Sequence, residues 1–326
     1  MKAVVLFNLG GPSSIKDVKG FLFNIFNDPA ILRLPNPFRY ILAKFISAKR
    51  EKEARLIYQQ LGGGSPIVHQ TLKQRDALNL HLGPLYDVYI CMRYWLPSIE
   101  EVIEQIRNKN YEEIILLPLY PQFSTTTTES FFYEWERISR NKGFQIPLKK
   151  ICCYPSHPGF IESYQLIINQ FLNENKIPPE TRFLFSAHGL PEKIVKAGDP
   201  YPFHVEKSVR YVLKGIPQIK DWVITYQSKV GPLKWLEPST ESEIKKAAKD
   251  KKPIAIIPIS FVSEHSETLY ELDILYKNLA IKEEIPAFYR LPTLQDSPLY
   301  INCLVDLIKS ATFNPCGLPY CRESCP

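Results

Sequence analysis

The stretch Phe183-Leu184-Phe185-Ser186-Ala187-His188-Gly189-Leu190-Pro191 decides how the chain is interpreted. Its apolar and aromatic residues predict a short buried strand, and the glycine and proline that follow end that strand in a turn. His188 is therefore predicted at the carboxyl end of a strand, where open α/β sheets bind their ligands. A single histidine in a turn more often only hydrogen-bonds nearby backbone, so His188 alone does not define a site.

The alternation of strand and helix runs through the whole chain. Further strands are predicted at residues 2–8, 87–92, 113–119, 222–226, 254–259 and 287–290, and helices at 69–82, 98–108, 160–173, 203–213, 239–248 and 264–279. This order is typical of parallel sheets with helices on both faces, and a length of 326 residues favours two domains. The segment 143–158, rich in proline and cysteine, is the candidate crossover. We predict an α/β protein with two Rossmann-like domains, residues 1–150 and 151–294, and a C-terminal segment 295–326 that packs back on the first domain.

Composition excludes several classes of function. Hydrophobic residues make up 45% and charged residues 23% of the chain, as in ordinary globular proteins. The net charge of +6 comes without a nucleic-acid-binding motif, so we expect no nucleic-acid partner, whereas an anionic small substrate or an anionic membrane surface stays open. We predict neither a signal peptide nor an apolar run that could span a membrane, and therefore expect a cytoplasmic enzyme.

A second stretch, residues 258–271, supplies partners for His188. A strand is predicted to end near its start, and the helix that follows would carry Glu264, Glu267 or Thr268, and Glu271 on one face at i, i+3/i+4 spacing. The helix dipole favours acidic residues in a first turn, which explains two of these glutamates but not Glu271. With His188 at the neighbouring strand end, imidazole and carboxylate could share one cleft, where they would bind a divalent metal or move protons at neutral pH.

The N-terminal segment 21–49 combines large apolar side chains with basic ones. Three interpretations fit this mixture: an ordinary core, a lip over a large apolar ligand, or a surface that rests on a membrane. The residues alone leave the three open.

Three of the seven cysteines, Cys316, Cys321 and Cys325, lie close together at the end of the chain. Exposed thiols at this density are uncommon outside metal sites, although three surface thiols are the simpler interpretation. Cys91 and Cys303 stand in apolar settings and are expected in the core.

Together these residues resemble one family, the ferrochelatases, which insert ferrous iron into a porphyrin. The matching segments follow the family's order: residues 6–12 (Leu-Phe-Asn-Leu-Gly-Gly-Pro), 62–67 (Gly-Gly-Gly-Ser-Pro-Ile), 93–94 (Arg-Tyr), 120–122 (Tyr-Pro-Gln), 186–191 (Ser-Ala-His-Gly-Leu-Pro), 198–202 (Gly-Asp-Pro-Tyr-Pro), 227–232 (Gln-Ser-Lys-Val-Gly-Pro) with Trp235, and 265–271 (His-Ser-Glu-Thr-Leu-Tyr-Glu). Each segment is a weak signal by itself, but the set is highly specific.

The resemblance implies two chelatase-type domains that face each other across a porphyrin cleft. His188 would be the catalytic histidine and Glu267 its partner, and both could bind Fe²⁺. A path for protons or metal would run along Glu264, His265 and Glu271. Porphyrin contacts would come from Tyr58, Ser65, Arg93, Tyr94, Tyr120, Ser124 and Trp235.

The implied reaction inserts Fe²⁺ into protoporphyrin IX, which forms protohaem and releases two protons in the last step of haem biosynthesis. Imidazole titrates near neutrality, so a histidine suits the base that takes the pyrrole protons. Ferrous iron is a substrate in this reaction, and the chemistry requires no cofactor. The alternatives are coproporphyrin III as substrate, a related cobalt chelatase, or a non-catalytic tetrapyrrole or metal carrier on the same fold.

The family also bears on the two segments left open above. Some ferrochelatases hold a [2Fe–2S] cluster with a cysteine-rich tail and one upstream cysteine. By that resemblance Cys316, Cys321 and Cys325 would bind a cluster, and Cys153, or alternatively Cys152, would replace the upstream ligand. The stretch that matches the animal enzymes' upstream ligand, residues 124–127, has no cysteine. Segment 21–49 matches the lip over the porphyrin, so we expect peripheral contact with the inner face of a membrane; the sequence indicates no oligomeric state.

Overall fold

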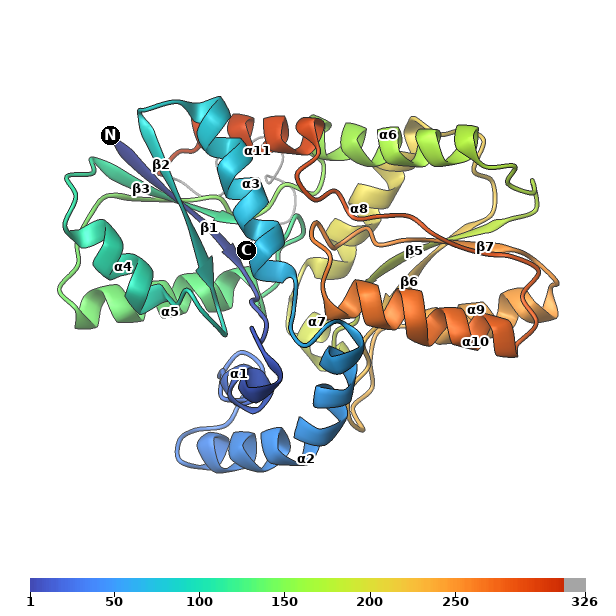
Figure 1. The fold of residues 1–326 in the computed structure, drawn as a ribbon, viewed down its shortest axis with the longest axis horizontal. Helices are drawn as coiled ribbons and strands as arrows, with labels where there is room; N and C mark the ends of the chain where they lie inside the picture. The colour runs from blue at the N-terminus through green and yellow to red at the C-terminus, as the bar shows by residue number, and fades with distance from the viewer. Residues whose placement is uncertain (314–326) are drawn as a thin grey trace. The chain divides into compact units, whose positions relative to one another are not determined.

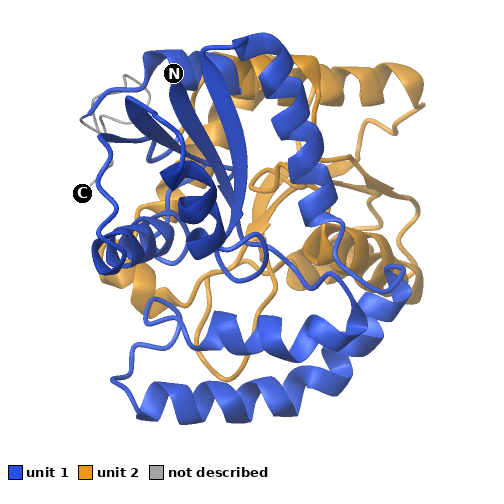
Figure 2. Cartoon of the chain, turned by 60° about the vertical axis from the view of Figure 1, so that its left-hand side comes forward, with its two compact units in different colours: residues 1–153, 304–319 blue, residues 154–303, 320–326 orange. Residues whose placement is uncertain are grey.

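The computed structural model describes residues 1–313 of the chain. The chain forms two compact units, residues 1–153 with the described residues from 304 onward, and residues 154–303 (Figure 2). For comparison, the domain boundary expected from the sequence lay at 150/151, and the units divide after Cys153. Of the segment 295–326 that was expected to return to the first domain, residues 295–303 cluster with the second unit.

The sheet of the first unit is entirely parallel, with the strand order β2-β1-β3-β4 (Figure 1). Its strands are β1 (Lys2–Asn8), β2 (Tyr86–Met92), β3 (Glu113–Pro118) and β4 (Leu148–Lys150). β3 and nearly all of β1 are buried, because an inner strand of a sheet covered on both faces has no solvent side. The sequence did not predict β4, whose three half-buried residues lie at the sheet edge within the presumed crossover.

Helices cover this sheet and add a separate layer. They are η1 (Ile15–Asp17, a 3₁₀ turn), α1 (Val18–Phe26), α2 (Phe38–Gln60), α3 (Ile67–Leu82), α4 (Ile99–Arg107) and α5 (Thr128–Asn141). α4 begins with a capping box between Ser98 and Glu101, as a serine before an apolar periodic run predicts. Alternate residues of β1 pack on α4 and α5, and Phe7 stacks on Phe131 with ring centroids 3.9 Å apart. α1 and α2 pack mainly on each other.

The second unit repeats this architecture with the strand order β6-β5-β7-β8, again entirely parallel. Its strands are β5 (Arg182–His188), β6 (Trp222–Gln227), β7 (Ile254–Ile257) and β8 (Phe288–Arg290). The predicted class, α/β with two parallel sheets flanked by helices, is therefore confirmed.

Helices lie on both faces of the second sheet. They are α6 (Pro158–Glu174), α7 (Glu192–Lys196), α8 (Tyr201–Lys214), α9 (Thr240–Lys249), η2 (Ser266–Tyr276) and α10 (Lys277–Lys282), and α11 (Pro298–Ser310) follows. Leu184 and Ile256 of the sheet pack against Ile244 of α9 and Leu272 of η2. Figure 1 shows α6 and α8 on the other side of the sheet from α9 and α10.

The helix after β7 differs from the predicted α-helix. η2 begins at Ser266 and is a π-helix up to Tyr276, where α10 continues it. A π-helix closes i→i+5 hydrogen bonds, so the residues that share a face differ from those of an α-helix. Because Glu264 lies before the first helical residue, the predicted common helical face of Glu264, Glu267 and Glu271 is wrong.

No helix within residues 1–313 combines the length and apolar character that crossing a bilayer requires.

Candidate active site

His188 is the last residue of β5, which lies between β6 and β7 in its sheet. Its predicted position at the carboxyl end of a strand is confirmed. The strand register pairs His188 with Gln227, the last residue of β6, and the His188 backbone N–H donates to Ser260 Oγ (3.3 Å) just after β7. Three strand ends therefore converge on one edge of the sheet, the edge at which open α/β sheets bind ligands.

Glu267 of η2 lies between two imidazoles. Its Oε1 is 3.7 Å from His188 Nε2, and its Oε2 is 3.5 Å from His265 Nε2. The His188 side chain is 37% exposed, whereas His265 is buried. The three groups run from an accessible imidazole through a carboxylate to a buried imidazole.

Backbone carbonyls determine which nitrogen of each ring faces Glu267. His188 Nδ1 lies 2.6 Å from the Gly189 carbonyl oxygen, and His265 Nδ1 lies 3.0 Å from that of Ser263. A carbonyl oxygen can only accept, so each Nδ1 carries a proton, and in the neutral form of either ring the lone pair is on Nε2. A lone pair that faces a carboxylate can take up a proton or bind a metal ion.

The carboxyl groups of Glu267 and Glu271 have pKa values that are pushed apart. Burial opposes the ionisation of Glu267, but His188 and His265 outweigh it and lower the pKa of Glu267 to about 2. Burial, reinforced by the Glu267 carboxylate, raises the pKa of Glu271 to about 7. Burial also disfavours the charged form of His265, yet Glu267 prevails and raises the pKa of His265. At neutral pH one carboxyl is ionised while its neighbour is about half protonated.

A buried hydrogen-bond network holds Glu271. Gln227 Nε2 donates to Glu271 Oε2 (2.9 Å) and to the backbone carbonyl of Glu267 (2.7 Å), and Ser228 Oγ donates to the same Oε2 (2.7 Å). Ser186 Oγ in turn donates to Gln227 Oε1 (2.7 Å). Sequence reasoning did not assign Gln227 and Ser228 to the site. The sequence feature that could have identified them is that they form a polar pair directly after a predicted strand.

Glu264 belongs to a different cluster. Its Oε1 accepts from Arg290 Nη1 (2.8 Å) and from the Thr293 backbone N–H (3.0 Å), and Arg290 also pairs with Asp273. Burial opposes the ionisation of Glu264, but Arg290 outweighs it and lowers the pKa of Glu264. A buried guanidinium thus already neutralises this carboxylate, unlike those of Glu267 and Glu271.

Trp235 lies beside the end of β5. Its ring centroid is 6.5 Å from that of His188, and its Nε1 donates to the Val230 carbonyl (3.1 Å). Gly189 makes this approach feasible, because a Cβ there would lie 2.8 Å from the Gln227 carbonyl oxygen and 3.2 Å from the Trp235 ring. The glycine that ends the strand therefore allows β5, β6 and Trp235 to meet.

In the first unit, Arg93 and Tyr94 follow β2 and share a buried carboxylate, that of Asp28. Arg93 Nη2 and the Tyr94 hydroxyl each lie 2.7 Å from Asp28 Oδ2, and Arg93 Nε donates to Ser130 Oγ (2.9 Å). Burial, together with Asp28, raises the pKa of Tyr94. Asp28 and Ser130 were not predicted as site residues, since nothing in their local sequence distinguishes them.

The other predicted porphyrin contacts of the first unit occupy varied settings. Tyr58 is buried on α2, and Ser65 is half-buried after the triple glycine, where its backbone N–H donates to the Pro12 carbonyl (2.8 Å). Tyr120 and Ser124 follow the carboxyl end of β3, half-buried and buried respectively.

Of the predicted cluster ligands, Cys153 lies among the described residues, and the three tail cysteines lie outside them. Cys152 and Cys153 are both buried, with their Sγ atoms 3.5 Å apart. Within residues 1–313, no group of three or more His, Cys, Asp or Glu side chains is arranged to hold a metal ion. Cys91 and Cys303 are buried, as expected.

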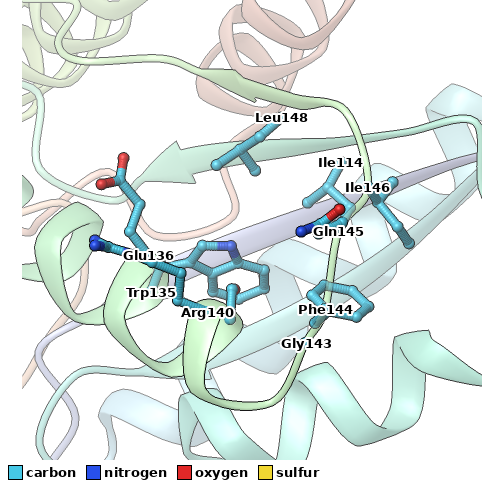
Figure 3. Close-up of a pocket in the computed structure, with 10 residues that line it drawn as sticks. Ile114, Trp135, Glu136, Arg140, Gly143, Phe144, Gln145, Ile146 and Leu148 are labelled. Atoms are coloured by element: carbon cyan, nitrogen blue, oxygen red, sulfur yellow. The ribbon is translucent and has the colours of Figure 1, made fainter.

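A pocket of about 340 Å³ lies in the first unit, between the end of α5 and β4 (Figure 3). Trp135, Phe144 and Ile146 form apolar walls, and Glu136 and Arg140 add charged groups. The pocket lies where β3 and β4 begin, whereas ligands of such sheets bind where strands end. None of the site residues predicted within 1–313 lines it.

Comparison with known proteins identifies the family of the chain. The ferrochelatase family model matches residues 1–312. The ferrochelatases of Wolbachia sp. subsp. Drosophila simulans (strain wRi) and of Rickettsia felis are each 50% identical to the chain, over 94% of its length and over 98% and 89% of their own.

Solved structures share the fold at low sequence identity. The sirohydrochlorin chelatase SirB from Bacillus subtilis subspecies spizizenii, in complex with cobalt, has a TM-score of 0.55 at 10% identity over 94% of both chains. CbiX, the terminal enzyme for biosynthesis of sirohaem in denitrifying bacteria, has a TM-score of 0.50 at 14% identity over 95% of this chain and 99% of its own. The chain belongs to the ferrochelatase family and is a lyase that inserts ferrous iron into a porphyrin.

Proposed function

We propose that the enzyme inserts Fe²⁺ into protoporphyrin IX, with His188 as the base that takes the pyrrole protons and Glu267 as its partner. One observation carries the proposal: the Glu267 carboxylate faces the Nε2 atoms of two imidazoles, at 3.7 and 3.5 Å. The family supports iron insertion in general, and the choice of porphyrin and the roles of the residues go beyond it.

Insertion exchanges one ferrous ion for two pyrrole protons, so charge is conserved when both protons leave. His188 Nε2 carries the lone pair that can accept such a proton, because Nδ1 donates to the Gly189 carbonyl. The imidazolium formed would lie beside the Glu267 carboxylate, which stabilises it. Glu271, with a pKa raised to about 7, can then accept and release protons at neutral pH.

Glu267 and His188 also suit a transient iron site. Carboxylate oxygen and imidazole nitrogen both bind divalent first-row metals. Two protein ligands bind an ion less firmly than a complete coordination shell, which suits an ion that must pass to the porphyrin.

Substitution of the two residues tests their roles. We expect His188→Ala and Glu267→Gln to lower kcat for iron insertion by about 10²–10⁴-fold, the usual contribution of a general base. The measurement is an anaerobic assay with Fe²⁺ and protoporphyrin IX. His81→Ala is the matched control, because His81 is exposed at the end of α3. Wild-type rates in both site variants would refute the assignment.

The porphyrin is identified by comparing kcat/KM for protoporphyrin IX and coproporphyrin III. A higher value for coproporphyrin III would replace the proposed substrate, and faster insertion of Co²⁺ than of Fe²⁺ would replace the proposed metal. Tight porphyrin binding without turnover of either porphyrin would indicate a carrier.

We further propose that the cytoplasmic enzyme rests on an anionic membrane surface through α2. Phe38, Ile41 and Phe45 lie along one stripe of this helix and are 61–66% exposed, and Lys49 and Lys52 continue the stripe. An exposed apolar stripe that ends in lysines suits a lipid interface with negative headgroups, as does the net charge of +6.

Vesicle sedimentation tests this contact. We expect the wild type to bind vesicles that contain phosphatidylglycerol, and the triple variant Phe38→Ser, Ile41→Ser, Phe45→Ser to bind at least about 10-fold more weakly, because lost apolar burial is worth about 1.5–3 kcal/mol per side chain. Leu80→Ser is the control, since Leu80 is an even more exposed apolar residue (84%) on a different helix, α3. Equal binding of the triple variant and this control would contradict the proposal.

We also propose that Cys153 and the three tail cysteines hold a [2Fe–2S] cluster. Cys153 fits as a ligand in one respect: its thiol is buried beside a second thiol, which gives soft sulfur donors in an apolar setting. The visible absorption of a thiolate-bound cluster in the anaerobic enzyme should disappear in Cys153→Ser. The absorption should persist in Cys91→Ser, the control from the same unit. If it disappears in Cys152→Ser and not in Cys153→Ser, Cys152 is the fourth ligand.

A further inference from the structure

Asp28 is a buried carboxylate that the reaction described above does not use. It follows α1 and its C-cap Asn27, and its side chain is 1% exposed. Its Oδ2 accepts hydrogen bonds from Arg93 Nη2 (2.7 Å), from the Tyr94 hydroxyl (2.7 Å) and from Ser130 Oγ (2.5 Å). Its Oδ1 accepts from the Ala30 backbone N–H (2.7 Å). Four donors on one carboxylate satisfy about all of its lone-pair sites, so its position is fixed by contacts from three parts of the unit.

These contacts hold the Arg93 guanidinium along one edge. Nη2 donates to Asp28, and Nε donates to Ser130 Oγ (2.9 Å), whose hydroxyl in turn donates a hydrogen bond to Asp28 Oδ2. The guanidinium also lies over the Tyr94 ring, 4.9 Å from its centroid. Among the described residues Nη1 has no hydrogen-bond partner. A planar guanidinium held at its Nε/Nη2 edge presents its Nη1 end in a fixed direction, and that end matches a carboxylate.

Asp28 also fixes the start of the segment that leads to α2. Its backbone carbonyl accepts from the N–H groups of Ile31 (3.1 Å) and Leu32 (2.9 Å). One residue therefore joins three parts of the first unit: the chain after α1, the carboxyl end of β2, and the first turn of α5.

We infer that Asp28 is a positioning residue that orients Arg93 toward a carboxylate of the porphyrin. The inference rests on the proposed function and on the porphyrin contact that the family resemblance implies for Arg93. Protoporphyrin carries two carboxylates on a planar apolar ring, and a preoriented guanidinium selects a carboxylate by direction as well as by charge. Arg93 meets the substrate, and Asp28 acts through Arg93.

Porphyrin binding without iron provides the test, because it does not depend on turnover. Dissociation constants would be measured by fluorescence titration with protoporphyrin IX and with its dimethyl ester, which lacks both carboxylates. We expect Arg93→Gln and Asp28→Asn each to weaken binding of the free acid by about 10-fold or more, as the loss of a charge-assisted hydrogen bond does. Neither variant should change binding of the ester.

A double-mutant comparison shows whether Asp28 acts through Arg93. The variant with both substitutions should bind the free acid within about twofold of Arg93→Gln alone, because coupled residues are not additive. Ser130→Ala keeps the charge of Asp28 but removes the hydrogen-bond acceptor of Arg93 Nε. It should weaken binding of the free acid to the same extent and leave binding of the ester unchanged. This variant replaces Asp28→Asn in the test if Asp28→Asn does not fold. Glu113→Gln is the matched control, since Glu113 is a buried carboxylate paired with Lys2 and Lys149 in the same unit.

Several results would overturn the inference. One is that Asp28→Asn binds the free acid as tightly as the wild type does. Another is that a variant weakens binding of the acid and the ester equally. A third is that the fold-loss of affinity in the double variant equals the product of the losses in the two single variants. Tighter binding of the free acid by Asp28→Asn would show that Asp28 only screens the charge of Arg93. A wild type that binds protoporphyrin in this pattern but inserts no iron would refute the proposed function and leave the inference standing.

Discussion

Glu271 retains its proton more firmly in the folded protein than an ordinary glutamate does. Burial and the Glu267 carboxylate raise its pKa from 4.5 to about 7. Between about pH 4.5 and pH 7 the folded state therefore binds more protons than the unfolded state, so the free energy of unfolding falls as the pH rises through this range. The lowered pKa of Glu267 has the opposite effect, but only below pH 4.5.

Glu271→Gln should remove this pH dependence. We expect the free energy of unfolding of the wild type to fall by about 1–3 kcal/mol relative to the variant between pH 5 and pH 8, since a pKa shift of one unit corresponds to about 1.4 kcal/mol. Urea denaturation at several pH values measures the difference. Parallel stability curves for the two proteins would contradict the assigned protonation of Glu271.

Ser228 combines a hydrogen bond with an unusual backbone. Its hydroxyl donates to Glu271, and its φ of 65° lies in the left-handed region that favours glycine. We expect Ser228→Ala to move the inflection of the pH–rate profile near pH 7 upward by about half a unit to one unit, because the ionised form of Glu271 loses a donor. Ser228→Gly should show the same shift. Its free energy of unfolding should be about 1 kcal/mol larger than that of Ser228→Ala, because glycine adopts a positive φ without strain. An unchanged pH–rate profile in both variants would show that the protonation of Glu271 does not control the rate of insertion.

At the level of secondary structure, η2 is the element that positions the chemistry. It starts with a reciprocal pair of hydrogen bonds: the His265 backbone N–H donates to Thr268 Oγ1 (3.0 Å), and that hydroxyl donates to the His265 carbonyl (3.1 Å). The pair fixes the first turn of the π-helix, in which Glu267 lies.

Thr268→Val tests this start of η2. The substitution keeps the shape of a fully buried side chain but leaves the His265 N–H without its acceptor. We expect the free energy of unfolding to fall by about 1–3 kcal/mol and kcat to fall with it, because Glu267 loses its support. Denaturation and the insertion assay measure the two effects. Thr268→Ser keeps the hydroxyl and should retain most of both; equal losses in the two variants would assign the effect to packing.

The elements differ in how well the sequence predicts them. The strands that carry His188 and Gln227 are recognisable because each is an apolar run that ends in turn residues. This pattern is local and does not depend on how the strand packs. The π-helix is not recognisable, since no local sequence pattern separates i→i+5 from i→i+4 bonding, and the contacts of Glu267 and Glu271 with Gln227 of β6 join residues 40 and 44 positions apart. β4 escapes prediction because a three-residue edge strand with two lysines lacks an apolar pattern.

For the whole molecule, the net charge of +6 makes membrane contact sensitive to salt. Raising the ionic strength from 0.15 M to 1 M shortens the Debye length from about 8 Å to about 3 Å. We expect binding of the wild type to anionic vesicles to weaken several-fold over this range, and residual binding to depend on Phe38, Ile41 and Phe45. Sedimentation at both salt concentrations measures this, and binding that is independent of salt would exclude the lysines of α2 from the contact.

The site as a whole was only partly predictable from the sequence. The sequence singled out His188 and Glu267, which the structure brings within 3.7 Å of each other, because each stands in a short stretch that combines a strand end with polar residues. Gln227, Ser228 and Asp28 were missed as site residues because their roles depend on neighbours far along the chain, such as Glu271, 43 residues from Ser228, and Arg93, 65 residues from Asp28.

The two sheets share one strand order, so each strand of the first unit has a counterpart in the second. β1 corresponds to β5, and their last residues, Asn8 and His188, are therefore equivalent positions. Asn8 is buried, and its side chain accepts from the Leu9 N–H (2.8 Å), whereas His188 is accessible. The same strand-end position therefore has two different settings: in the second unit its side chain is accessible beside Glu267, and in the first it caps its own turn and donates to Thr71 Oγ1 (3.4 Å).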